Sequence, residues 1–194
     1  MAEVAGPGVA EALAGHRPAD AAEEADLDRV RALVAGTDDP WSRALPLHVT
    51  GSALVVHPPS GRVLLRWHDR MGSWLQIGGH GDPGESSPLD VALREGREET
   101  GLTDLTPWPD PDAPLLVQVA VVPVPAAKGE PAHHHADVRY LLATDRPDDV
   151  RPEHPDAPLR WATLDEARSL VAEDNLRVAL DRAADLFARR SPRR

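Results

Sequence analysis

Residues 79–102 read GHGDPGESSPLDVALREGREETGL and contain a glycine-rich loop followed directly by a helix signal. Ser87 is a preferred N-cap residue, Pro88 suits the first helical position, and Asp90 stands where a capping box is completed. Gly101 follows the last residue of the pattern and is typical of a helix C-terminus. The sequence therefore predicts a helix between Ser87 and Gly101, preceded by a loop with unusual backbone angles.

Three carboxylates lie on one face of this predicted helix. Glu95, Glu98 and Glu99 are spaced i, i+3 and i+4, and they span roughly 100° of the helix circumference. One interpretation is an ordinary solvated face relieved by Arg94 and Arg97. However, the five fixed positions of R-E-x-x-E-E-x-G match by chance on the order of once in a million starts, at roughly 6% usage per residue type, which favours a functional site. An adjoining stripe predicts the face that packs on a sheet: Leu89, Ala92, Leu93 and Gly96.

The same stretch resembles the box of the Nudix hydrolases, G-x5-E-x7-R-E-U-x-E-E-x-G-U. It departs from that pattern twice, because eight residues rather than seven separate Glu85 from Arg94, and Gly96 stands at an apolar position. The extra residue falls in the loop before Ser87 and can be absorbed without moving the helix carboxylates. Gly96 costs about 1 kcal/mol of helix propensity but permits close approach to a sheet. The matching residues are Gly79, Glu85, Arg94, Glu95, Glu98, Glu99, Gly101 and Leu102.

The resemblance covers residues 49–164 and implies a fold and an activity. The implied fold is a Nudix-type α/β/α sandwich with a mixed β-sheet. The implied activity is hydrolysis of a diphosphate linkage in a nucleoside diphosphate joined to a further moiety X. The implied cofactor is Mg²⁺ or Mn²⁺, hard cations that take oxygen ligands.

Roles for individual residues also follow from the resemblance, position by position. Glu95, Glu98 and Glu99 would hold the metal. Arg94 would orient Glu95 or Glu85 through a charge-assisted hydrogen bond. Glu98 is the preferred general base, although members of the family take that base from different places in the chain. Arg94, Glu95, Glu98 and Glu85 are therefore the expected catalytic set.

The segments on either side of the box predict strands. Residues 45–57 and 63–67 are rich in Val, Leu and Thr and flank a turn at residues 58–61, which indicates a β-hairpin. Strands before and after one capped helix favour a mixed α/β or α+β fold. The remaining expectations are a short apolar piece at 74–77, buried strands at 115–122, 138–143 and 159–162, proline-rich connections at 106–114 and 123–131, and a C-terminal amphipathic helix at 164–189, interrupted near residue 174.

The first forty residues lie outside the resemblance. Glycine and proline punctuate residues 1–18, which predicts a loose arm. Residues 21–35 carry apolar side chains at helical spacing behind an acidic first turn, and this pattern predicts a short amphipathic packing helix. We expect residues 1–40 to form an N-terminal helical extension and residues 41–194 to form the Nudix domain.

Several side chains are candidates for contacts with substrate. Gly79 and His80 lie at the start of the box loop, where a substrate phosphate could bind. His133 and His135 should point the same way if their segment is extended, and could contact phosphate or a transition metal. A plain solvated loop is the alternative for this histidine run. Trp74 offers a stacking surface for a nucleobase, whereas core packing is expected for Trp67.

Composition excludes several classes of protein. The 194 residues carry a net charge of −11, which repels a polymeric nucleic acid but allows a small phosphorylated substrate held through a cation. There is no cysteine, which excludes disulfides, thiolate metal sites and a cysteine nucleophile. The chain has neither a signal-peptide pattern nor a membrane anchor, so a cytoplasmic protein without a membrane partner is expected. The sequence leaves the oligomeric state open, and a homodimer is possible.

The substrate is assigned by elimination. Family sub-motifs that mark particular substrates are mostly missing, so a nucleoside triphosphate, such as an oxidised or non-standard one, is the default. Isomerases of this fold need a cysteine and are excluded. The alternatives are a silent Nudix domain that binds a nucleotide-like ligand as sensor or scaffold, and an acidic interaction domain without a metal. Metal-dependent thermal stabilisation would separate the last from the others.

Overall fold

The protein is described here by a computed structural model that covers residues 6–127 and 129–190. Its centre is strand β1, Leu47–His57, which pairs in parallel with β7, His133–Ala143. The other side of β1 pairs antiparallel with β4, Ile77–His80, and with β2, Arg62–His68. Strand β6, Leu116–Val124, is antiparallel to β7 on the far side. The result is the expected mixed sheet.

Shorter strands complete the sheet. Strand β2 pairs antiparallel with β3, Ser73–Leu75, and with β8, Leu159–Thr163. Strand β5, Thr106–Pro107, pairs with the end of β7. The predicted hairpin between β1 and β2 is confirmed, since Val55 pairs with Leu64 across a turn.

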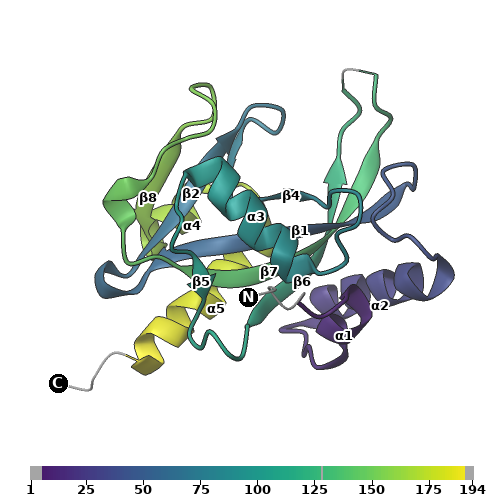
Figure 1. The fold of residues 1–194 in the computed structure, drawn as a ribbon, viewed down its shortest axis with the longest axis horizontal. Coiled ribbons are helices and arrows are strands. Elements are labelled where there is room, and N and C mark those ends of the chain that lie inside the picture. The colour runs from purple at the N-terminus through teal and green to yellow at the C-terminus, as the bar shows by residue number, and fades with distance from the viewer. Residues whose placement is uncertain (1–5, 128, 191–194) are drawn as a thin grey trace.

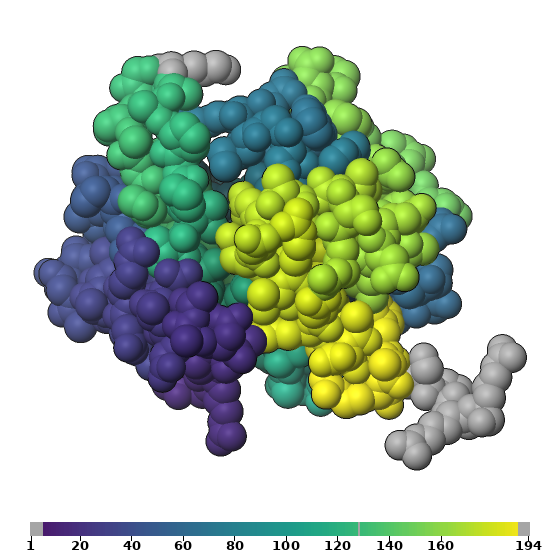
Figure 2. Space-filling view, turned by 180° about the vertical axis from the view of Figure 1, so that it is seen from behind, coloured from purple at the N-terminus to yellow at the C-terminus, as the bar shows by residue number. Residues whose placement is uncertain are grey.

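Helices cover both faces of this sheet, so the expected α/β/α sandwich is confirmed (Figure 1). Helix α3, Pro88–Thr100, packs on one face through Leu89 and Ala92, in a buried cluster shared with β1 and β7. Helices α4, Leu164–Leu170, and α5, Asp174–Arg190, lie side by side over the other face (Figure 2). The interruption predicted near residue 174 therefore falls between these two helices.

The caps of α3 match the sequence prediction at both ends except at one hydrogen bond. The Ser87 hydroxyl accepts a hydrogen bond from the Asp90 amide, and Gly101 ends the helix in the left-handed region at φ 70°. However, the Asp90 carboxylate accepts from the Gly6 amide, 2.9 Å away, and not from Ser87. The expected capping box is thus only half formed, because the N-terminal segment reaches across the start of α3.

The expectation of a loose N-terminal arm is wrong for the described part of residues 1–18. Helix α1, Val9–Ala14, buries Val9 and Leu13, which remain 5% and 2% exposed. Helix α2, Ala21–Gly36, forms as predicted and packs beside β6 (Figures 1 and 2). Apolar side chains of both helices join the core cluster under α3, which explains why α1 is ordered. Residues 1–5 of the expected arm lie outside the described residues.

Two segments expected as loops are strands. Strand β7 begins at His133 rather than at residue 138, because residues 133–136 pair with β6. Gly78 and Gly79 belong to β4, where Gly78 adopts φ 150° against β1.

Among the described residues, no helix is long and apolar enough to span a membrane.

Candidate functional site

Arg94 of α3 gathers the acids of the box. Its Nη1 lies 3.0 Å from Glu95 Oε1 and 2.8 Å from Glu98 Oε2. Its Nε and Nη2 bind the two carboxylate oxygens of Glu85 at 3.0 and 3.1 Å, and Nη2 also donates to the His80 carbonyl. The extra residue before α3 therefore leaves Glu85 within reach of Arg94. Burial would raise the pKa of Glu85, but the hydrogen bond from Arg94, the hydrogen bond from the Asp82 amide and the charge of Arg94 together outweigh it and lower that pKa.

The three acids of α3 differ in environment. The Glu98 side chain is 52% exposed. Glu99 is only 7% exposed, accepts a hydrogen bond from the Gly78 amide at 3.1 Å and lies 3.3 Å from Arg66. Burial raises the pKa of Glu99 to about 7 and also raises the pKa of Glu95, despite the neighbouring arginines. Burial therefore disfavours the charged form of both acids.

This donor set fits a hard divalent cation. Three carboxylates, Glu85, Glu95 and Glu98, bind the Arg94 guanidinium, and Glu99 pairs with Arg66. Carboxylate oxygen is the ligand that Mg²⁺ and Mn²⁺ prefer. Glu99 is buried and Glu95 half-buried, both with raised pKa values, which is expected where a cation normally supplies the balancing charge.

Gly79 leaves room for one of these acids. A Cβ atom added at Gly79 would stand 2.5 Å from Glu95 Oε1, closer than side chains approach. The glycine at this position therefore allows the strand β4 backbone to lie against the Glu95 carboxylate. Gly79 was predicted as a site residue from the sequence. The physical reason for a glycine there is the close approach of the β4 backbone to Glu95, not a strained backbone angle.

A cavity of about 530 Å³ adjoins the acids. The acids of α3 do not line it, but Arg66 and Gly78, both in contact with Glu99, do. Within the described part of the chain, three buried side-chain atoms have no hydrogen-bond partner, and their residues all line this cavity: Ser52 Oγ, Gln76 Oε1 and Arg139 Nη2. Orphaned polar atoms beside a cavity indicate groups that a ligand would satisfy.

The rest of the polar lining is well connected. Asp137 accepts hydrogen bonds from Thr50, Gln76 and Arg139, and the last of these is fully buried. Arg139 Nη1 also binds Gln118 Oε1 at 2.7 Å. Sequence reasoning missed these residues, because polar positions in strands of hydrophobic neighbours give no motif. The only available signal was charge within a predicted buried strand.

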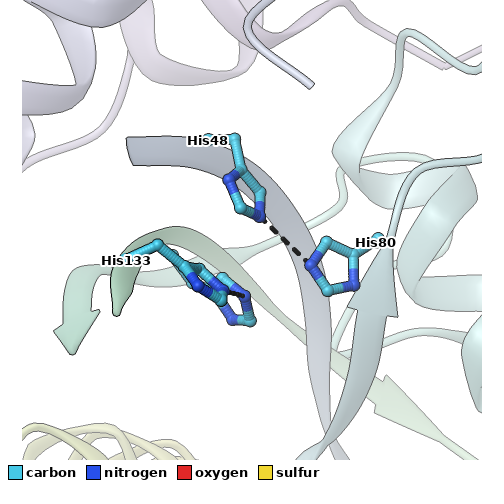
Figure 3. A group of neighbouring side chains, drawn as sticks. His48, His80 and His133 are labelled. Atoms are coloured by element: carbon cyan, nitrogen blue, oxygen red, sulfur yellow. Dashed lines mark hydrogen bonds between the residues drawn. The ribbon is translucent and has the colours of Figure 1, made fainter. Parts of the chain in front are cut away.

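A group of histidines lines the same cavity (Figure 3). His80, His133 and His135 were predicted as candidates, and His133 and His135 point the same way, as alternation requires. The structure adds His48, which pairs beside His135 in the parallel β1 and β7 strands. Burial, together with neighbouring positive charge, lowers the pKa of His80 to about 4 and that of His135 to about 3.

The two tryptophans lie elsewhere. Trp67 and Trp74 pair across β2 and β3 with ring centroids 5.7 Å apart. Their strand neighbours Arg66 and Leu75 line the cavity, so alternation turns the tryptophans to the other face of the sheet. Trp74 packs there against the cluster under α4 and α5. The structure therefore does not bring Trp74 to the cavity. Trp67 is half-buried beside Trp74.

Comparison with known proteins agrees with this fold. The family model of the NUDIX domain matches residues 47–183. A C. elegans Ap4A hydrolase is similar in structure, with a TM-score of 0.56 and 21% identity over 72% of this chain and 97% of that one. The Nudix hydrolase RenU of M. smegmatis has a TM-score of 0.53 and 21% identity over 76% of this chain and 89% of its own. The E. coli dihydroneopterin triphosphate pyrophosphohydrolase has a TM-score of 0.52 and 18% identity over 71% of this chain and 93% of its own. No curated protein matches the chain in sequence.

The sandwich fold, the acids on α3 and the match over most of the chain define the class. The chain belongs to the Nudix family. Its fold is that of the solved Nudix hydrolases.

Proposed function

We propose that this protein hydrolyses a diphosphate linkage in a small nucleotide-like substrate with the help of Mg²⁺ or Mn²⁺. The observation that carries the proposal is the network around Arg94, which aligns Glu85, Glu95 and Glu98 beside a cavity with a polar lining. A surface with a net charge of −11 favours a small substrate over a polymeric nucleic acid.

The roles of the residues follow from their surroundings. Glu95, Glu98 and Glu99 would hold the cation. When bound, the cation neutralises charge on the diphosphate and lowers the pKa of an attacking water. Arg94 positions Glu85, Glu95 and Glu98 by charge-assisted hydrogen bonds. Glu98 is the most exposed of the three metal-binding acids and is proposed to accept the proton of the attacking water.

The cavity would hold the rest of the substrate. Ser52 Oγ, Gln76 Oε1 and Arg139 Nη2 have no hydrogen-bond partner within the described chain, although Arg139 Nη2 lies 3.9 Å from Glu173 Oε2. They offer acceptors and a donor for the polar edge of a base or similar ring. A nucleoside triphosphate, oxidised or non-standard, remains the proposed default. A cytoplasmic location and a homodimer remain predictions as well.

A panel of substrates tests the proposal. Release of phosphate or pyrophosphate would be measured with Mg²⁺ and then Mn²⁺, from canonical and oxidised nucleoside triphosphates, sugar nucleotides, ADP-ribose, dinucleoside polyphosphates and NADH. Turnover of at least one compound by the wild type, lost in Glu98→Gln, is expected. Binding of metal and nucleotide without turnover of any compound would instead indicate a ligand-binding Nudix domain. Absence of metal binding would contradict the metal-dependent mechanism.

A further inference from the structure

The four cavity histidines converge from three strands. His48 lies at the start of β1, His80 at the end of β4, and His133 and His135 on β7. One ring nitrogen from each lies within 4.8 Å of the others. Figure 3 shows the rings of His48 and His80 turned toward one another, with His133 beside them.

Within each of two pairs, the ring nitrogens are already spaced as in a metal site. His48 Nε2 and His80 Nε2 are 3.1 Å apart, and His133 Nε2 and His135 Nε2 are 3.2 Å apart. Ligand nitrogens at about 2.05 Å from a tetrahedral zinc ion stand about 3.3 Å from one another. Each pair therefore already has the spacing of two ligands of one ion. The separations between the pairs, which lie within 4.8 Å, would close by up to about 1.5 Å when all four nitrogens bind.

Backbone carbonyls orient two of the rings for this purpose. His48 Nδ1 lies 3.1 Å from the Leu45 oxygen, and His133 Nδ1 lies 2.9 Å from the Pro131 oxygen. Because a carbonyl only accepts, each Nδ1 carries a proton, and in the neutral ring each Nε2 keeps a lone pair that faces the neighbouring histidine. Histidine ligands of metals are held in their tautomer in the same way.

We propose that His48, His80, His133 and His135 bind one transition-metal ion of the Zn²⁺ type. Imidazole nitrogen suits zinc and its neighbours in the periodic table, whereas Mg²⁺ prefers the oxygen ligands of α3. The lowered pKa values of His80 and His135 agree with neutral rings able to donate lone pairs. This site is separate from the acids, although Arg94 touches the carbonyl of His80.

A phosphate site built from charged histidines is the competing interpretation of the cluster. At separations of 3.1 and 3.2 Å, one nitrogen of each close pair accepts a hydrogen bond and therefore lacks a proton. At least one ring of each pair is then neutral, so the four rings are not all charged. The geometry therefore favours a cation as occupant over an anion.

Zinc binding by the untagged full-length protein, stripped with a chelator, tests this inference. Calorimetric titration with Zn²⁺ in excess Mg²⁺ should give one site per chain, and Co²⁺ should give the visible absorption of a tetrahedral nitrogen site. His133→Ala should weaken zinc binding by at least about 100-fold, because loss of a mere partner of a ligand already costs 10- to 100-fold. His48→Ala should do the same, and circular dichroism of both metal-free variants verifies that they are folded.

Two controls separate this site from the acids and from the neighbouring surface. His134→Ala should bind zinc like the wild type, because His134 lies between the two ligands in sequence but does not line the cavity. Glu98→Gln should also keep zinc binding, whatever its effect on hydrolysis. Zinc affinity unchanged in folded His133→Ala and His48→Ala, or lost in Glu98→Gln, would overturn the inference.

Discussion

At the scale of single residues, Arg94 decides how the acids of α3 are arranged. One guanidinium contacts Glu85, Glu95, Glu98 and the carbonyl of His80, so a single side chain joins the helix, the preceding loop and β4. Its contacts also explain why the irregular spacing of the box is tolerated. The loop absorbs the extra residue, and the ion pair with Glu85 is retained.

Gly79→Ala tests the close approach between β4 and Glu95. The added methyl group would stand 2.5 Å from Glu95 Oε1 and displace the carboxylate. We expect kcat to fall on the order of 100-fold, the cost of an ångström-scale misplacement, with a smaller effect on the melting temperature. Gly36→Ala is the control, because a Cβ there meets nothing within 4 Å. Equal activity of the two variants would contradict the role given to Gly79.

Ser52→Ala tests the assignment of the cavity to substrate. The buried Ser52 hydroxyl has no partner within the described chain, so its removal should leave the free energy of unfolding unchanged or raise it. If substrate normally binds this oxygen, KM should rise about 5-fold with kcat retained, which corresponds to about 1 kcal/mol for a neutral hydrogen bond. An unchanged KM would show that the substrate does not use Ser52.

At the scale of elements, acidic side chains of α2 close the outer edge of the sheet. The Val119 and Val121 amides of β6 donate to Glu23 and Asp26, each at 2.9 Å. Arg182 of α5 donates to the Val117 carbonyl and binds Glu23 at 2.6 Å. Since an unpaired strand edge invites association with other chains, these contacts protect β6 as well as hold α2 in place.

Glu23→Gln should change how stability depends on pH. Burial would raise the pKa of Glu23, but hydrogen bonds from His16, Ala19 and Val119 and the charge of Arg182 outweigh it and lower that pKa to about 2. A carboxylate with a lowered folded-state pKa stabilises the protein above about pH 4.5 and loses this contribution as the pH falls toward 2. The contribution is on the order of 3 kcal/mol.

Urea unfolding of the wild type and Glu23→Gln, each at about pH 7 and about pH 3, measures this effect. The difference in free energy of unfolding should be large near neutrality and shrink in acid. Glu24→Gln is the matched control, because Glu24 is exposed on the same helical turn and should show little difference. A pH-independent difference for Glu23→Gln would contradict the linkage.

At the scale of the whole molecule, the sequence predicted what periodicity and capping encode. The hairpin, the capped helix α3 and the broken C-terminal helix follow from local patterns, and so does the line of acids on α3. Helix α1 at residues 9–14 could not be predicted in this way, because it depends on long-range burial of Val9 and Leu13 in a shared core. The contribution of His48 also escaped prediction, since it joins His135 only through the parallel pairing of β1 with β7.

Deletion of residues 1–36 tests whether the extension is dispensable. It would remove four buried apolar side chains, Val9, Leu13, Leu27 and Val30, and uncover the edge of β6. Burial of each side chain stabilises the fold by about 1.5–3 kcal/mol, so the deletion removes more than about 5 kcal/mol of stabilisation. We therefore expect the truncated chain to unfold or to associate. Light scattering and thermal unfolding would show it. A monodisperse fragment with an unchanged melting temperature would mean that residues 37–194 fold without the extension.

The central claim is that the acids on α3 make this protein a metal-dependent hydrolase. The most direct measurement is hydrolysis of the best substrate of the panel by protein stripped of metal, before and after addition of Mg²⁺, in the wild type and in Glu98→Gln. We predict no turnover without the cation, recovery in the wild type, and at least about 100-fold less in Glu98→Gln. Turnover in the presence of a chelator, or equal rates for the two proteins, would contradict the claim.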